Sequence, residues 1–166
     1  MAIRPCRIRT GSGLIVAVLA ACMAMACEKP TEVTIEGSSS GDSLTGSSYL
    51  SAMRLHSAEG AAIIDDYEDL LRIWNATKNL DYGRSESSNL LGRVRSLLFK
   101  VGALLPPSNS KLAHELFISA FEAFEASLTF ANRFYASDGT DENSLLQANL
   151  KILEGNDLLE RFNEAN

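Results

Sequence analysis

The stretch NLLGRVRSLLFKVGALLPP, from Asn89 to Pro107, has the spacing that decides the fold class. Its apolar residues recur every three or four positions, which places them on one face of an α-helix. The two prolines at its end stop that helix, because proline has no backbone N–H and clashes with the preceding turn. The predicted core stripe is Leu90, Val94, Leu97, Val101 and Leu104, widened by Leu91, Leu98 and Leu105.

Three further segments between Tyr49 and Asn166 show the same helical period, and no run of alternating β-branched residues competes with it. Four amphipathic helices with short connections pack as antiparallel neighbours. We therefore expect an all-α domain at 49–166, folded as an up-down-up-down four-helix bundle. Its other expected core residues are Leu50, Met53, Ile64, Tyr67, Leu71 and Trp74 in the first segment, Leu116, Ala120, Ala123, Phe124, Phe130 and Phe134 in the third, and Leu146, Leu150, Leu153, Leu159 and Phe162 in the fourth.

Two details of these segments add local expectations. Between the third and fourth segments, Gly139 suits the position after a helix and Thr140 or Asp141 suits the next cap. After the proline pair, Ser108 or Ser110 can cap the third helix. That helix carries more aromatic rings than one stripe needs, so it either lies centrally in the core, which we favour, or lines a groove. The rings are Phe117, Phe121, Phe124, Phe130, Phe134 and Tyr135.

The net charge of the chain indicates which classes of partner it can bind. The chain has 15 basic and 21 acidic residues, for a net charge of −6. Arg4, Arg7 and Arg9 are the charged residues before Glu28, so the remainder carries a net charge of about −9. Binding to phosphates needs clustered lysine and arginine. The acidic body therefore argues against a nucleic-acid partner.

The N-terminus has the three-part layout of a secretory signal peptide. Three arginines come first, an apolar run begins at Leu14, and small residues lead into Cys22. The run from Leu14 to Cys27 has 14 residues, which is shorter than the roughly 20 needed to span a membrane. Leu19-Ala20-Ala21-Cys22 resembles the lipobox of bacterial lipoproteins, which is an aliphatic residue, two small residues and a cysteine.

The lipobox resemblance implies that a diacylglyceryl group is attached to the Cys22 thiol and that residues 1–21 are removed. It implies a protein held by lipid at the cell membrane or the outer membrane, facing the periplasm or the exterior. Two alternatives stay open: lipidation of Cys27 instead, or an ordinary signal cleaved before Cys27. The Ser/Gly-rich stretch up to residue 48 is then a flexible tether, so that 22–48 separate the anchor from the body.

A search for reactive groups in the body finds no assembled site. His56 and Glu59 share a helix face at i,i+3, but a pair on a solvated polar face is the ordinary interpretation. His114, beside Glu115, is likewise expected on the surface. No serine or cysteine nucleophile motif, haem-attachment motif or calcium loop occurs. We therefore expect no catalytic residues, no resident metal and no cofactor.

One charged cluster has a functional interpretation. Asp65, Asp66, Glu68 and Asp69 lie beside Tyr67 and Trp74 on one predicted helix. Such a run is most often a solvated face and less often a docking patch for a basic partner. The resulting hypothesis is a lipid-anchored binding or scaffolding module, not an enzyme, with a protein or small ligand of the cell envelope as partner. The alternative is a metal or cofactor carrier that uses His56 and Glu59, with His114 as a further ligand.

Overall fold

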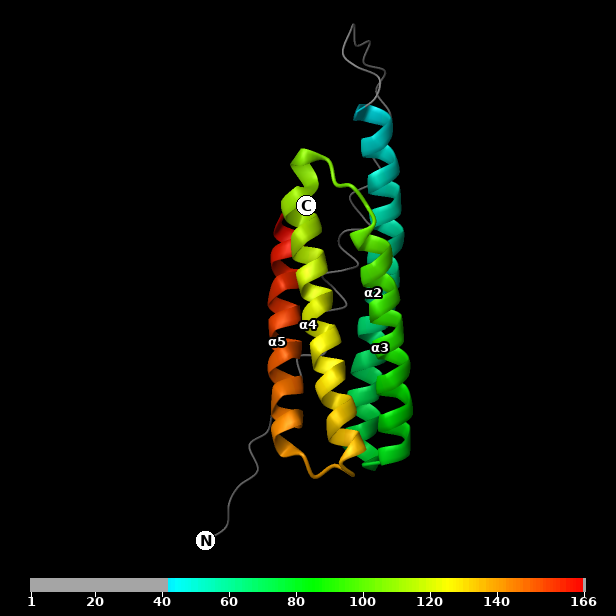
Figure 1. The fold of residues 1–166 in the computed structure, drawn as a ribbon, viewed down its shortest axis with the longest axis vertical. Helices are drawn as coiled ribbons and strands as arrows, with labels where there is room; N and C mark the ends of the chain where they lie inside the picture. The colour runs from blue at the N-terminus through cyan, green and yellow to red at the C-terminus, as the bar shows by residue number, and fades with distance from the viewer. Residues whose placement is uncertain (1–41, 166) are drawn as a thin grey trace, which may run out of the picture. The chain divides into compact units, whose positions relative to one another are not determined.

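The computed structural model describes residues 42–165, and all of its regular structure there is helical (Figure 1). This confirms the predicted all-α class. The described range contains four long helices and one short 3₁₀ turn, η1. They are α2 (Asp42–Thr77), α3 (Leu80–Gly102), η1 (Ser108–Ser110), α4 (Lys111–Ala136) and α5 (Glu142–Glu164).

Helices that follow one another in the sequence lie side by side and run antiparallel (Figure 1). Between α2 and α3, Arg93 bonds to Asp66 and Lys100 bonds to Glu59, so residue numbers rise along one helix as they fall along the other. Helix α4 in turn packs on α3 and, most extensively, on α5. No Cα atom of α2 lies within 8 Å of a Cα atom of α5, so the backbones of these two described helices do not approach each other closely.

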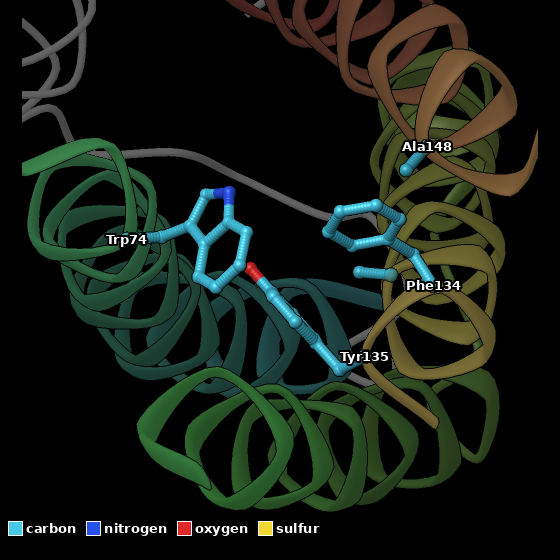
Figure 2. Close-up of a cluster of buried hydrophobic side chains, with 5 residues drawn as sticks. Trp74, Phe134, Tyr135 and Ala148 are labelled. Atoms are coloured by element: carbon cyan, nitrogen blue, oxygen red, sulfur yellow. The ribbon is translucent and has the colours of Figure 1, made fainter. Parts of the chain in front are cut away.

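Helix α4 supplies the centre of the core, as the aromatic pattern predicted. Five of its six rings are buried, and Phe130 is partly buried. Near one end of the core, Phe134 and Tyr135 meet Trp74 of α2 and Ala148 of α5 (Figure 2). The Trp74 ring centroid lies 5.6 Å from that of Phe134 and 5.1 Å from that of Tyr135, both in edge-on geometry, which aromatic rings favour.

A buried hydrogen-bond chain joins three helices. The Tyr67 hydroxyl of α2 lies 2.7 Å from Ser127 Oγ of α4, and Ser127 donates over 2.7 Å to the carbonyl oxygen of Ala148 in α5. Because the Ser127 hydroxyl donates its only proton to the Ala148 carbonyl oxygen, the Tyr67 hydroxyl must donate to Ser127 Oγ. Burial raises the pKa of the Tyr67 phenol. The chain thus satisfies two hydroxyl groups that would otherwise be costly to bury.

The predicted core stripe of α5 is wrong for three of its five residues. Leu159 and Phe162 are buried, but Leu146, Leu150 and Leu153 are between 49% and 65% exposed. The face turned to α4 instead carries the small residues Ser144, Ala148 and Gly155. A Cβ at Gly155 would lie 2.9 Å from the Phe124 ring, so the large α4 rings occupy the space that leucines of α5 would fill.

Two other expected core leucines are also exposed. Leu105 is 90% exposed because α3 ends at Gly102, so the helical period no longer sets its direction. Leu50 is 50% exposed on a flank of α2. The central stripe of α3 is confirmed, with Leu90, Val94, Leu97 and Val101 fully buried.

The connections follow the predicted turn chemistry. Gly139 has a φ of +75°, the left-handed conformation that glycine adopts after a helix. Asp141 caps α5: one carboxylate oxygen accepts from the Ser144 backbone N–H at 3.0 Å and the other accepts from the Ser144 hydroxyl at 2.6 Å. Ser110 occupies the cap position of α4 without a side-chain hydrogen bond.

The first described helix starts earlier than its composition indicates. Residues 42–48, assigned above to the tether, form the first turns of α2. Once Tyr49 and Met53 are packed in the core, extending the helix toward the N-terminus gains one hydrogen bond per residue without a new nucleus. Within the described range, none of the helices combines the length and the apolar character required to cross a bilayer.

Candidate functional site

The four acidic residues of the predicted partner surface lie on the outer side of α2, in two different electrostatic environments. Asp66 points toward α3 and forms an ion pair with Arg93. Asp65, Glu68 and Asp69 fall on an adjacent strip of the helix, away from α3. The structure therefore brings three of the four side chains together as one surface strip, which we call the acidic strip (Asp65, Glu68 and Asp69).

The acidic strip is only partly neutralised. Arg72 bonds to Asp69 with an N–O distance of 2.9 Å, one turn along the same helix. Burial, with the charges of Asp65 and Asp69 beside it, raises the pKa of the Glu68 carboxyl. Three carboxylates on one strip, with Arg72 bonded to one of them, concentrate negative charge here. The strip can therefore attract a cation or a basic side chain.

The aromatic residues beside the acidic cluster do not take part in this surface. Tyr67 is 4% exposed and Trp74 is 9% exposed, and both pack inward against α4. The predicted core positions of Tyr67 and Trp74 are therefore confirmed, and these two rings contribute nothing to the acidic surface. Tyr67 and Trp74 fall on the core stripe of α2, and core packing determines their orientation.

His56 and Glu59 lie close together, as their spacing predicts, but they are not a solvated pair. The His56 side chain is only 12% exposed, and its Nδ1 lies 3.6 Å from a Glu59 carboxylate oxygen. Lys100 donates to the other Glu59 oxygen over 2.8 Å. This hydrogen bond is the main reason that the pKa of Glu59 is lowered, with His56 a smaller contributor. Glu59 is thus engaged by a lysine from α3.

The prediction that His114 lies on the surface is wrong. His114 is 6% exposed, and its Nδ1 lies 3.2 Å from the Tyr49 hydroxyl of α2. Burial lowers the pKa of the imidazole, and the charge of Glu115 opposes this effect. No three histidine, cysteine or acidic side chains gather in a metal-binding arrangement among residues 42–165. Periodicity could have found this position, since His114 falls on the buried face with Phe117 and Phe121.

The helices also present a second kind of surface, made of exposed apolar side chains, which the helical period alone did not predict. Some lie along α5, where the expected core stripe faces outward. Others lie where α3 ends, where α4 begins and along the start of α2. These side chains are Leu146, Leu150 and Leu153 on α5, and Leu50, Leu55, Phe99, Leu105 and Leu112 elsewhere.

The predicted lipidation site, Cys22, lies outside the described residues, as does Cys27. No known family model, curated protein or solved structure matches the chain. Its function must therefore be inferred from its own residues.

Proposed function

We propose that this chain is a lipid-anchored protein of the cell envelope whose helical body is a binding or scaffolding module. The observation that carries the proposal is the order of features at the N-terminus: basic residues, an apolar run, and Leu19-Ala20-Ala21-Cys22. Two or three acyl chains on one cysteine hold a protein at a membrane far longer than one chain does. On this proposal the protein faces the periplasm or the exterior from the cell membrane or the outer membrane.

For the body, we propose an up-down-up-down bundle with its α2–α5 side more open than the other three. The antiparallel contacts of α2 with α3 and α3 with α4 support this topology. The absence of close backbone approach between α2 and α5, as described, supports the open side. The helices then serve as a rigid frame that presents its outer faces to a partner.

The acidic strip on α2 is the proposed partner surface. Asp65, Glu68 and Asp69 face outward with a single arginine, Arg72, bonded to one of them. Concentrated negative charge steers a basic partner toward the surface, and salt weakens this steering. Asp66 belongs to the α2–α3 ion pair and has a structural role.

No observation favours the alternative function, a metal or cofactor carrier. Glu59 accepts a hydrogen bond from Lys100, and His114 is bonded to Tyr49 in the core. Lys100 holds one Glu59 oxygen and Tyr49 lies at one His114 nitrogen, so each side chain has only its other ligand atom left for a metal ion. We therefore retain the binding module as the proposed function.

The anchor is tested by metabolic labelling with palmitate. The Cys22→Ala variant should lose the label and accumulate as uncleaved precursor, because the modified thiol is gone. The matched Cys27→Ala variant should keep the label and be processed normally. Label that persists in Cys22→Ala and disappears in Cys27→Ala would show that Cys27 is the modified residue, and no label in either protein would refute the anchor.

The surface is tested by affinity capture from envelope extract with the full chain as bait. The triple variant Asp65→Asn, Glu68→Gln, Asp69→Asn should lose captured proteins that the parent retains, and added salt should weaken capture by the parent. A control that neutralises three acidic residues elsewhere, Glu122→Gln, Asp157→Asn and Glu160→Gln, should capture normally. Equal losses in both variants would mean that only net charge matters, which would contradict the proposed surface. Stoichiometric metal in the purified protein would favour the carrier instead.

A further inference from the structure

The first turns of α2 extend past the helix that flanks the rest of α2. The ion pair between Glu59 and Lys100 sets the register of the antiparallel helices α2 and α3. Two residues further along α3, that helix ends at Gly102, beside residue 57 of α2. Residues 42–56 therefore lie beyond the end of α3, and in Figure 1 the cyan start of α2 reaches past it. We call residues 42–56 the α2 overhang.

The sequence and packing of the α2 overhang stabilise it only weakly. Residues 42–48 contain three serines, a threonine and a glycine, all of which favour a helix less than alanine or leucine does. Tyr49 and Met53 are the buried residues within 46–56. No Cα atom of α2 lies within 8 Å of a Cα atom of α4, so side chains join the overhang to α4 without close backbone packing. A segment with few buried contacts opens more readily than the rest of a fold.

The contact between Tyr49 and His114 joins the α2 overhang to α4. The Tyr49 hydroxyl lies 3.2 Å from His114 Nδ1, and both residues are 6% exposed. Nδ1 of a neutral imidazole can accept the hydroxyl proton. A protonated imidazole carries a proton on both nitrogens, so it can no longer accept this bond, and its positive charge is costly to bury. The contact therefore requires the neutral form of His114.

The groups around His114 do not compensate a positive charge on its ring. Tyr49 faces the ring from α2 as an uncharged phenol. Among residues 42–165, no carboxylate oxygen forms an ion pair with His114. Burial lowers the pKa of the imidazole, and the charge of Glu115 opposes this effect. The charged side chains near this level of the bundle are all exposed: Arg54 on α2, Lys111 and Glu115 on α4, and Glu160, Arg161 and Glu164 on α5.

We propose that the α2 overhang is an acid-sensitive element, in which a proton on His114 breaks the contact with Tyr49 and releases residues 42–56 from α4. Release exposes Tyr49 and Met53, which are buried in the closed form. The acidic strip begins at Asp65, in the part of α2 that α3 flanks, so it keeps its place when the overhang opens. The proposal goes beyond the proposed function and does not depend on the lipid anchor.

His56 lies in the same overhang but should not act in this way. Its Nδ1 is buried without a hydrogen-bond partner in the described part of the chain, and a Glu59 carboxylate oxygen lies 3.6 Å away. A proton on His56 is attracted to this carboxylate, which belongs to the same helix. Protonation of His56 thus adds an ion pair within α2 and breaks no contact with α4. The variant His56→Gln is therefore the matched control for His114→Gln.

Hydrogen exchange of backbone amides, measured on the full chain by mass spectrometry, tests the proposal. Protection is expressed relative to an unstructured chain at the same pH, and residues 46–56 are compared with residues 62–72 of the same helix. We expect 46–56 to be several-fold less protected than 62–72, because the overhang opens without global unfolding. Between about pH 7.5 and about pH 5.5 its protection should fall further, by up to about tenfold, because His114 in the open form titrates near the ordinary value of about 6.5.

The variants assign the change to one histidine. The fall in protection at 46–56 should disappear in His114→Gln and persist in His56→Gln. Protection at 46–56 that equals that at 62–72, that is unchanged by pH in the parent chain, or that still falls in His114→Gln overturns the proposal. If His114→Gln opens the overhang at both pH values, the parent chain decides by nuclear magnetic resonance. The titration of the His114 ring protons must then share its midpoint with the loss of protection, and a protonated His114 with a protected overhang overturns the proposal.

Discussion

At the scale of single residues, His114 shows how the core accommodates a titratable group. Its ring lies in the first turn of α4 against Tyr49, with the centroids 5.8 Å apart and the hydroxyl 3.2 Å from Nδ1. The neutral ring satisfies the buried hydroxyl, so the pair costs little as long as the imidazole stays uncharged. A histidine placed in this way makes the stability of the fold depend on pH.

The pH dependence has a definite sign. Burial lowers the pKa of His114, so the folded protein binds a proton less readily than the unfolded chain does. The free energy of unfolding should therefore be highest above about pH 6.5, where the unfolded histidine is neutral, and should decrease as the pH falls below that value. Denaturant titrations at several pH values between about 7.5 and about 5 measure this change in the free energy of unfolding.

The variant His114→Gln keeps a hydrogen-bonding group beside Tyr49 but removes the titration, so it should flatten this pH dependence. His56→Gln is the matched control, and the contribution of His114 should persist in it. An unchanged slope in His114→Gln would show that other groups cause the dependence.

At the scale of the helix, the close approach of α2 and α3 to the rings of α4 limits certain positions to small residues. A Cβ at Gly83 of α3 would lie 2.5 Å from the Tyr135 ring, and a Cβ at Gly60 of α2 would lie 2.6 Å from the Phe121 ring. Both rings belong to the central helix and are almost fully buried. Small residues on the surrounding helices thus make room for the rings of α4.

Two glycines of α3 give a matched test of this packing. Gly83→Ala should lower the free energy of unfolding by about 1–3 kcal/mol, because Tyr135 is held by Trp74 and Phe134 and cannot move away freely. A Cβ at Gly92 in the same helix would have no neighbouring atom within 4 Å. Gly92→Ala should therefore raise the free energy of unfolding by up to about 1 kcal/mol, because alanine has a higher helix propensity than glycine. Chemical denaturation of both variants decides the point, and a stabilised Gly83→Ala would contradict the close approach.

At the scale of the whole molecule, the core is built around α4 and is not shared equally by four helices. The central stripe of α3 and the rings of α4 are buried, whereas much of α5 faces outward. Three leucines of α5, Leu146, Leu150 and Leu153, thus remain exposed on the surface. The described helices consequently carry exposed apolar side chains on α5 and around the α3–α4 connection, and an acidic strip on α2.

The unequal burial of α3 and α5 predicts different losses of stability when a leucine of each helix is replaced by alanine. Leu97→Ala removes a fully buried side chain and should cost about 2–5 kcal/mol in unfolding free energy. Leu150→Ala removes a side chain that is 49% exposed and should change it by no more than about 0.5 kcal/mol. Urea titration of both variants measures the difference. Comparable losses would mean that α5 buries its leucine stripe after all.

Several features of the candidate site were within reach of the sequence. The spacing of His56 and Glu59 predicted that they lie together, and the grouping of Asp65, Glu68 and Asp69 on one strip follows from helix geometry. The cross-helix partners of Asp66 and Glu59 were not predictable, because Arg93 and Lys100 come from another helix. Such contacts depend on the relative register of α2 and α3, which local periodicity does not encode.

The sequence by itself determined the all-α class, the central stripe of α3, the aromatic core of α4 and the turn at Gly139 and Asp141, because these follow from helical period and local backbone chemistry. Only the tertiary structure decided which side of α5 is buried. Leucines are the more apolar candidates on that helix, yet Ser144, Ala148 and Gly155 face α4. The physical reason is volume: between residues 144 and 155 the large rings of α4 leave space for small residues on the buried side of α5, and close packing there outweighs the hydrophobicity of the individual side chains.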